Sequence, residues 1–308
     1  MPAGCAFVLL AVTALGVAGC GLGAGPTPSA VQLTVTRDFG RRTLAHTGAL
    51  KLRGQETAMS LLMRNYTVAT RFGGGFVQSV DGLAGGQEGG APVDWFYYDN
   101  GVEATKGAAA TDVHAGDRVW WDRHDWRETP DVPAVVGSFP EPFLDGLAGK
   151  RLPVRIECES VTGYACRTVT ARLRAAGVPA AVAALGSVGG PLTLRVLVGR
   201  WASIGADAGA VTVERGPRVS GVYARFSSDG RTLTPLDQDG RAQTPLSAGA
   251  GLIAAVRHAE DAPVWLVTGT DAGGVERAAR GFDQATLHDR FAVAIDAAGA
   301  RALPELAP

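Results

Sequence analysis

Alternation of apolar and polar residues organises the first half of the chain. A half-buried strand is predicted at Val31–Thr36, where every second residue is apolar. A helix is predicted at Glu56–Tyr66, because its apolar residues recur at helical spacing, as Met59, Leu62, Met63 and Tyr66 do. Strands are also predicted at residues 43–49 and 76–80. The first half therefore reads as a small sheet with one helix lying across it.

The densest aromatic stretch runs from Asp94 to Trp126 and contains four of the 6 Trp residues of the chain. Its two ends, residues 94–99 and 118–126, are rich in aromatic and β-branched residues and are predicted to be strands. Successive side chains of a strand point to opposite faces, so both faces of this pair carry aromatic rings. A small sheet has only one core face, and the other set of rings needs a second cover. That cover is a helix, the second half of the chain or a ligand.

A proline-rich crossover is predicted at residues 128–153, between the two halves. Proline fixes φ and donates no backbone hydrogen bond, so the segment cannot continue a helix or a strand ladder. Its prolines are Pro130, Pro133, Pro140, Pro142 and Pro153. Its large apolar residues include Val135, Val136, Phe139 and Phe143. This is too much apolar surface for a free linker, so we expect the segment to lie across one or both domains.

Strands alternating with amphipathic helices are predicted from Val154 onward. The predicted strands are residues 154–158, 178–185, 192–198, 221–226, 264–267 and 291–295. Helices are predicted at residues 166–176, around 206–214 and around 275–282. Asp229-Gly230 and Asp239-Gly240 are turn signals of hairpins. This alternation is typical of an α/β or α+β layered domain, predicted here at residues 154–297, with residues 298–308 as a tail.

The N-terminal residues have the features of an export signal. Residues 6–17 form an apolar stretch that is shorter than the about 20 residues of a transmembrane helix. Val17-Ala18-Gly19-Cys20 follows and resembles the bacterial lipobox, in which cleavage leaves the cysteine as a lipid-modified first residue. Residues 1–20 are therefore predicted to be a lipoprotein signal peptide, and residues 21–30 a flexible tether. An ordinary signal peptide with an incidental Cys20 is the alternative.

The cysteines and the net charge predict a disulfide and argue against a metal site and against nucleic-acid binding. Export removes Cys5 with the signal and lipid occupies Cys20, so Cys158 and Cys166 remain. A pair at this spacing in an oxidising compartment is most simply one disulfide. Two cysteines with no neighbouring histidine make a poor metal site. The net charge of −1 gives no basis for nucleic-acid binding.

The order of motifs in the first half resembles a known family. The motifs are Val31–Thr36, Thr57–Leu62, Gly75–Gly82, Trp95–Gly101 and Gly116–Trp121. They look like the bacterial lipoprotein domain similar to the C-terminal β-domain of transcobalamin and intrinsic factor, here at residues 31–127. The resemblance implies a ubiquitin-like β-grasp fold (ββαβββ) and a binding module outside the cytoplasm, with cobalamin as the ligand of its animal relatives. Together with the second half it predicts an α+β protein of two domains.

No catalytic constellation is predicted. His124 and Asp125 are adjacent and point to opposite faces of the predicted strand, and no Ser or Cys nucleophile lies in a strained elbow nearby. Asp237 begins a sequence like a calcium loop, but the distal Glu of such a loop is absent, so a hairpin turn is expected. Asp271 follows a predicted strand and is expected to cap the helix after it.

Three classes of function remain open. We favour a lipoprotein on the outer face of the cell membrane that acts as a non-enzymatic binding module for cobalamin or another planar small molecule. Its expected partner is a membrane transporter of an uptake system or another envelope protein. The second class is an envelope scaffold or protein-interaction lipoprotein with no small-molecule ligand, and the third is an enzyme with its site in the second domain. The candidate ligand-binding residues are Trp95, Tyr97, Tyr98, Trp120, Trp121, His124 and Trp126.

Overall fold

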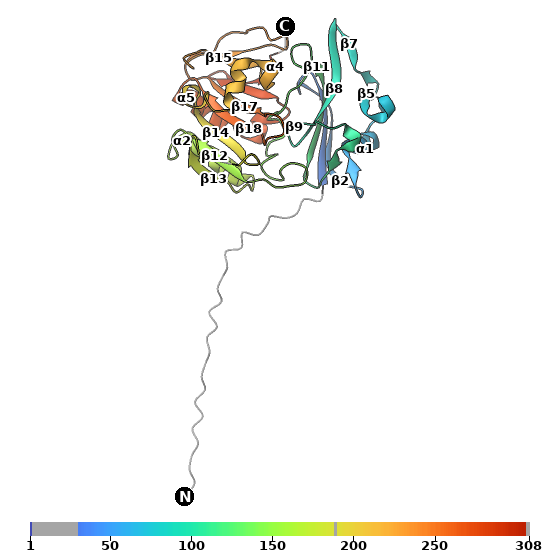
Figure 1. Cartoon of the computed structure of the whole chain (residues 1–308), viewed down its shortest axis with the longest axis horizontal. Coiled ribbons are helices and arrows are strands. Elements are labelled where there is room, and N and C mark those ends of the chain that lie inside the picture. Colours follow the sequence, from blue (N-terminus) through green and yellow to red (C-terminus); the bar gives the residue numbers. More distant parts are fainter. Residues whose placement is uncertain (2–29, 188–189, 306–308) are drawn as a thin grey trace.

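The fold is that of a computed structural model, which describes Met1, residues 30–187 and residues 190–305. Apart from Met1 and Ala30, the predicted signal peptide and tether lie outside the described residues, and so does Cys20. The described residues form two halves that lie side by side, each built on its own sheet (Figure 1). The predicted α+β class, with two sheet-based regions, is confirmed.

The sheet of the first half is built around a parallel pair of strands. Its strands are β1 (Ala30–Arg37), β2 (Arg42–Lys51), β7 (Gly86–Glu88), β8 (Ala91–Asp99), β9 (Val102–Glu103) and β11 (Arg118–Asp125). Their order is β2-β1-β11-β8-β7, with β9 beside β8. The parallel pair is β1 and β11, in which Leu33 lies opposite Val119. The first strand, β1, and the last, β11, are therefore neighbours at the centre of the sheet, and a helix lies across it. This is the predicted β-grasp arrangement.

Helix α1 (Ala58–Asn65) packs in the core on one face of this sheet. Thr57 caps it, because its hydroxyl accepts from the Ser60 backbone while the Ser60 side chain accepts from the Thr57 backbone. The predicted stripe is wrong at Met63, which is 53% exposed, whereas Leu61 is fully buried. The stripe assumed a helix through Tyr66, but the helix ends one residue earlier. The buried residues of the helix are Ala58, Met59, Leu61 and Leu62, so the predicted Met59 and Leu62 do face the core.

Short elements connect the helix to the long strands. They are β3 (Glu56–Thr57), β4 (Val68–Arg71), η1 (Phe72–Gly74), β5 (Phe76–Val80), β6 (Leu83–Ala84), η2 (Ala108–Ala110) and β10 (Asp112–Val113). β5 belongs to a separate sheet of order β4-β5-β6, so the prediction that residues 76–80 join the main sheet is wrong. Asp81 and Gly82 have left-handed φ values of 46° and 83° and fold the chain straight back onto β5. Its two neighbours in sequence therefore occupy both of its edges.

The crossover, residues 128–153, runs between the two halves without a named helix or strand. Val132 and Val135 pack in the hydrophobic core that joins the two halves. Val136, Phe139 and Phe143 pack in a second core, on the other face of the second sheet. As predicted, the segment lies across both domains rather than forming a free linker.

The second sheet contains seven strands within the described residues. They are β12 (Val154–Cys158), β13 (Ala181–Ala184), β14 (Leu194–Arg200), β17 (Gly251–Val256), β18 (Val264–Gly269), β19 (Ala292–Asp296) and β20 (Gly299–Leu303). The order is β13-β12-β14-β18-β17-β19-β20. The first four are mutually parallel, and the last three join in antiparallel pairs.

Helices cover both faces of the second sheet. On one face, α2 (Tyr164–Ala175) and α5 (Ala272–Arg280) pack in the same core as the crossover phenylalanines. The opposite face is covered by α3, η3 and the hairpin β15–β16. The bounds of the remaining elements are α3 (Trp201–Ile204), η3 (Ala210–Arg215), α4 (Pro217–Ser220), β15 (Ala224–Phe226), β16 (Leu233–Pro235) and α6 (Gln284–Leu287).

Two strands of this sheet were not predicted. β17 is buried along its whole length, yet Gly and Ala make up half of it, and both residues are depleted in strands. β20 lies in the stretch predicted to be a tail, residues 298–308, and pairs with β19 through Ala302 opposite Val293. The tail assignment is therefore wrong. Its small residues and Arg301 hide the apolar alternation that marks a strand.

Aromatic side chains join the two halves. Tyr98, Trp120 and Phe39, which lies in the β1–β2 turn, come from the first half. All three pack on Phe291 of the second half, with ring centroids 5.5, 5.3 and 5.2 Å from it. Tyr98 is 0% and Trp120 2% exposed. The second half of the chain is therefore the cover that the second aromatic face required.

Candidate functional site

The candidate aromatic residues lie on β8 and β11 in antiparallel register. Trp121 lies opposite Tyr97, and Trp120 lies opposite Tyr98. Trp95, Tyr97 and Trp121 belong to the core that contains α1, whereas Tyr98 and Trp120 belong to the core that joins the two halves. The predicted division of the rings between two faces is confirmed.

The set that faces α1 is packed and hydrogen-bonded. The rings of Tyr97 and Trp121 stack with centroids 4.7 Å apart. The Trp95 indole donates to the carbonyl of Leu83 at 3.1 Å, and the Tyr97 hydroxyl lies 2.6 Å from the carbonyl of Lys106. Burial raises the pKa of Tyr97 to about 12, so its hydroxyl remains a donor at neutral pH. These contacts fix the rings in place.

His124 lies on the other face, in an aromatic sandwich. Its ring stacks on Phe39 at 4.5 Å and on Phe96 at 4.4 Å between centroids. Its Nδ1 lies 2.8 Å from Asp122 Oδ1. The same carboxylate accepts the backbone N–H groups of Phe39 at 3.1 Å and Gly40 at 2.8 Å. The pair of Asp122 and His124 therefore holds the β1–β2 turn against the interface.

A cavity of about 350 Å³ opens at the edge of β8. β7 pairs with residues 91–93 and β9 with residues 98–99 of this strand. No described strand pairs with residues 94–97 on that edge, and the cavity lies at this gap. Its walls include Phe76, Trp95, Phe96, Tyr97, Glu103 and Trp126. We call it the aromatic cavity.

Two carboxyl groups line the aromatic cavity. The Trp126 indole donates to Asp94 Oδ2 at 3.0 Å, which orients the ring. Burial raises the pKa of Asp94, against the lowering effect of that hydrogen bond. The pKa of Glu103 is raised to about 7, first by burial and then by the charge of Asp131, although the backbone N–H of Val132 lowers it. Glu103 thus changes charge near neutral pH beside aromatic walls.

Three of the seven candidate ligand-binding residues, Trp95, Tyr97 and Trp126, line the aromatic cavity. Of these, Trp126 is partly buried, whereas Trp95 and Tyr97 are 5% and 8% exposed. The other four are at most 3% exposed and lie in the two cores: Tyr98, Trp120, Trp121 and His124.

Six residues that line the aromatic cavity were not among the candidates: Phe76, Asp94, Phe96, Glu103, Ala104 and Pro130. Phe96 had a signal, because it lies between two candidates on the same strand. Phe76 comes from β5 and Glu103 from β9, and no sequence pattern links either element to this edge. Only the tertiary fold brings them together.

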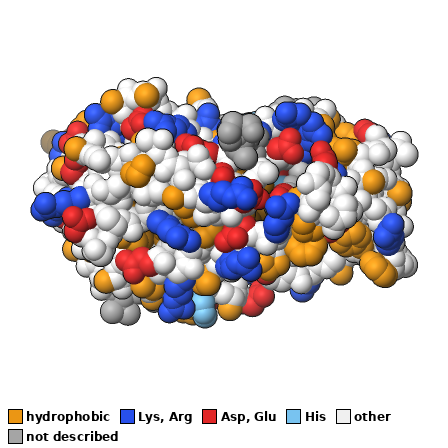
Figure 2. All heavy atoms as spheres, turned by 90° about the horizontal axis from the view of Figure 1, so that it is seen from above, with side chains coloured by type: hydrophobic (Ala, Val, Ile, Leu, Met, Phe, Trp, Pro, Cys, Tyr) orange, Lys and Arg blue, Asp and Glu red, His pale blue; other side chains and the backbone are white. Residues whose placement is uncertain are grey.

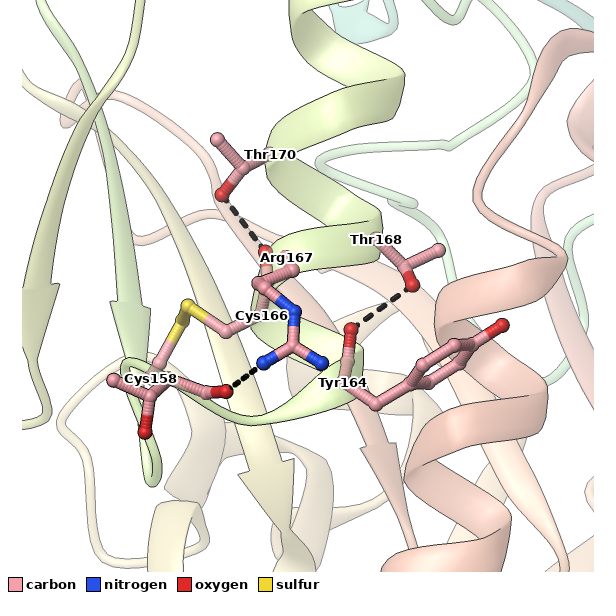
Figure 3. Close-up of a disulfide and its surroundings, with 7 residues drawn as sticks. Cys158, Tyr164, Cys166, Arg167, Thr168 and Thr170 are labelled. Atoms are coloured by element: carbon pink, nitrogen blue, oxygen red, sulfur yellow. Dashed lines mark hydrogen bonds between the residues drawn. A yellow bond between two sulfur atoms is a disulfide. The ribbon is translucent and has the colours of Figure 1, made fainter.

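Cys158 and Cys166 form the predicted disulfide, with Cα atoms 5.9 Å apart. Figure 3 shows that it joins the end of β12 to the first turn of α2. One turn further along α2, the Thr168 hydroxyl donates to the carbonyl of Tyr164 at 2.9 Å, and the Thr170 hydroxyl donates to the carbonyl of Cys166 at 2.7 Å. Both cysteines are buried, so the bridge is a structural link between sheet and helix.

Two other motifs have the local roles that were expected of them. The Asp271 carboxylate accepts the N–H of Gly274 at 2.8 Å and caps α5. The Asp237 carboxylate accepts the N–H groups of Asp239 and Arg241 at 3.0 and 2.9 Å, which stabilises a tight turn. Both aspartates therefore have structural partners in the protein.

Clustered metal ligands and membrane-spanning helices are absent from residues 30–187 and 190–305. In that part of the chain, no group of three or more His, Cys, Asp or Glu side chains is placed to hold a metal ion. No helix of the same described part is long and apolar enough to cross a membrane.

Residues 55–125 match the model of a protein family described as "Domain of unknown function (DUF4430)". The match covers less than a quarter of the chain and contains α1, β8 and β11. Its description names neither a lipoprotein nor transcobalamin. No curated protein matches the chain. The chain is thus similar to this family over the stretch that carries most of the aromatic cavity.

Proposed function

We propose that the protein is a cell-envelope lipoprotein that acts as a non-enzymatic binding module for a planar small molecule. The observation that carries the proposal is the aromatic cavity at the open edge of β8. Trp126 offers partly exposed aromatic surface there, Trp95 and Tyr97 add apolar wall, and Glu103 offers a polar group that can orient a ligand. Small-molecule sites combine mostly apolar and aromatic walls with a few placed polar groups in this way.

The volume of the cavity limits the ligand. Its about 350 Å³ lies near the lower end of the roughly 300–1,000 Å³ that small-molecule sites occupy. A corrin ring with its side chains is larger, so cobalamin would enter by one edge or side group only. Because ordering a ligand costs several kcal/mol, such partial contact supports a Kd of about micromolar or poorer. A smaller flat ligand is expected to bind more tightly.

The envelope location rests on the sequence. Val17-Ala18-Gly19-Cys20 and the tether that follows are those of a chain held by lipid at the outer face of the cell membrane. A binding module held there is suited to pass its ligand to a membrane transporter of an uptake system. Another envelope protein that receives the ligand would also have to contact the module near the aromatic cavity.

Calorimetry with cobalamin, cobinamide and riboflavin as probes tests the proposal. Trp126→Ala is expected to weaken binding by about tenfold or more, because truncating a tryptophan anchor costs about 2 kcal/mol or more. Tyr164→Ala is the matched control, since Tyr164 is a 44% exposed aromatic residue on α2, outside the aromatic cavity. No heat with any probe at millimolar concentration, or equal binding by Trp126→Ala and wild type, would contradict the proposal.

An envelope scaffold with no small-molecule ligand is the second candidate. The burial of Tyr98, Trp120, Trp121 and His124 favours it, because these rings already have partners inside the protein. Silence of all three probes together with membrane anchoring through Cys20 is the result that this candidate requires.

A further inference from the structure

A second cavity, of about 560 Å³, lies where the two halves meet. Residues 39–41 of the β1–β2 turn line it from the first half, and residues 288–290 and 300–302 line it from the second. It shares no lining residue with the aromatic cavity. Ligand sites occur preferentially at such junctions between domains. We call it the junction cavity.

Charged side chains dominate this region of the molecule. Lys and Arg side chains gather with Asp and Glu between the two halves on the face shown in Figure 2. The charged side chains that line the junction cavity are Arg41, Arg290, Arg301, Asp289 and Glu305. What the cavity can bind depends on which of these charges already have partners.

Two of its three arginines have partners in the protein. Arg301 forms an ion pair with Asp296 and has Glu305 Oε1 3.7 Å from its Nη1. Arg41 donates from Nη2 to the carbonyl of Ala302 at 2.8 Å. Neither needs a further ligand.

Arg290 is the exception. Within residues 30–187 and 190–305, no ion pair or hydrogen bond reaches its guanidinium, and its Nη1 is buried without a hydrogen-bond partner. Burial lowers the pKa of Arg290. A charged group without a partner in the protein is costly, and the guanidinium of Arg290 lines the junction cavity, where an ion can supply that partner.

Arg41 brings a second positive charge to the same place. Burial lowers the pKa of Arg41 most, Glu305 raises it, and the charge of Arg290 lowers it further. The two guanidinium groups therefore lie close enough to repel each other. The turn that carries Arg41 is held in place, because the backbone N–H groups of Phe39 and Gly40 donate to the Asp122 carboxylate. The fold holds this repulsive pair in one cavity.

We propose that the junction cavity binds a small soluble oxyanion, a carboxylate or a phosphate, through Arg290 with Arg41 beside it. The planar fork of a guanidinium matches both groups and can bind them through two parallel hydrogen bonds. The anion pairs with the part of the Arg290 guanidinium that lines the cavity and screens its repulsion with Arg41. Ala300 and Ala302 add apolar wall, and the volume leaves room for the carbon skeleton of an organic anion.

The test measures thermal unfolding and calorimetric binding of the full-length protein in a neutral detergent. The probes are inorganic phosphate and succinate, with sodium chloride at matched ionic strength as the control for screening. We expect at least one probe to raise Tm beyond chloride. Arg290→Ala should weaken its binding by about tenfold or more, as expected when hydrogen bonds to a charged group are lost. Arg174→Ala, an exposed arginine on α2, is the matched control and should bind as the wild type does.

A second readout separates ligand binding from a structural role of Arg290. Without an anion, Arg290→Ala should raise Tm, because it removes an unpaired charge from a partly buried site. In phosphate or succinate the wild type should gain Tm and the variant should not. Arg290→Lys keeps the positive charge but lacks the planar guanidinium, so its affinity for the anion should lie between those of the wild type and Arg290→Ala.

Three results would overturn the proposal. They are no Tm shift beyond chloride with either probe, binding by Arg290→Ala as tight as that of the wild type, and a response to phosphatidylglycerol vesicles alone. The last result would assign the cavity to a lipid headgroup instead of a soluble anion. Since Arg290 is not part of the aromatic cavity, these outcomes are independent of the proposed binding module.

Discussion

Phe39 provides a direct test of how the two halves are joined. It lies in the β1–β2 turn, is 1% exposed and packs on His124, Tyr223 and Phe291 at centroid distances of 4.5, 5.5 and 5.2 Å. Phe39→Ala removes a ring that both halves surround. Lost transfer free energy and the cavity left behind cost about 3–5 kcal/mol for a buried phenylalanine. We expect the free energy of unfolding to fall by that amount.

Phe72→Ala is the matched control. Phe72 has a left-handed φ of 53°, close to the 59° of Phe39, but it is 86% exposed. The backbone cost of alanine at positive φ is thus similar in both variants, and their difference reports burial. Urea unfolding with the disulfide intact, followed by tryptophan fluorescence, gives the two midpoints at a common m value. The control should change stability by less than about 0.5 kcal/mol. A difference between the variants below about 1 kcal/mol would refute the packing described for Phe39.

Three further outcomes are expected. Cys20→Ser should release the protein from membranes and abolish labelling with palmitate, and a variant that stays in the membrane fraction contradicts the lipid assignment. Thiol titration of the unfolded, unreduced protein should find Cys158 and Cys166 blocked, whereas two reactive thiols contradict the bridge. Burial raises the pKa of Asp99 to about 8 and that of Glu141 to about 7, so the folded protein keeps protons that the unfolded chain releases. Stability should therefore fall as pH rises from about 4 to about 8. Asp99→Asn should make this fall smaller, measured as the difference between the urea midpoints at about pH 5 and about pH 8; an unchanged difference contradicts the raised pKa of Asp99.

Strongly periodic elements could be predicted from the sequence, and β17 shows why others could not. α2 was predicted at residues 166–176 and spans Tyr164–Ala175, because its apolar stripe is what packs on the sheet. β17 has Gly251 and two alanines where a strand normally has branched residues. In the fold, an added Cβ on Gly251 would lie 2.5 Å from the carbonyl oxygen of Gly274 in α5. Gly251, one of the small residues that hide the strand, is thus the residue that lets the helix approach it.

The aromatic cavity was only partly predictable for a similar reason. Strand alternation correctly divided the rings of β8 and β11 between two faces. The open edge at residues 94–97 depends on where β7 and β9 end, and these strands of three and two residues are too short to carry a pattern. Glu103 joins the cavity from β9 through that geometry alone. The arginine surplus of the junction cavity likewise arises from residues far apart in the sequence.

The second half of the chain covers one face of the first sheet, and this limits where a ligand can bind. Tyr98, Trp120 and Phe39 pack on Phe291, so removing the second half would expose all three rings. An aromatic side chain buries about 150–250 Å². Three of them make an apolar patch at or above the several hundred Å² that a soluble monomer exposes. At about 25 cal/mol per Å², covering this patch stabilises the protein by at most about 11–19 kcal/mol, and by less where the rings already cover each other. A ligand that needed this face would have to displace the second half against that free energy, whereas the aromatic cavity at the edge of β8 is present without any rearrangement. The same sheet can therefore use one face as a domain interface and still bind a ligand along its edge.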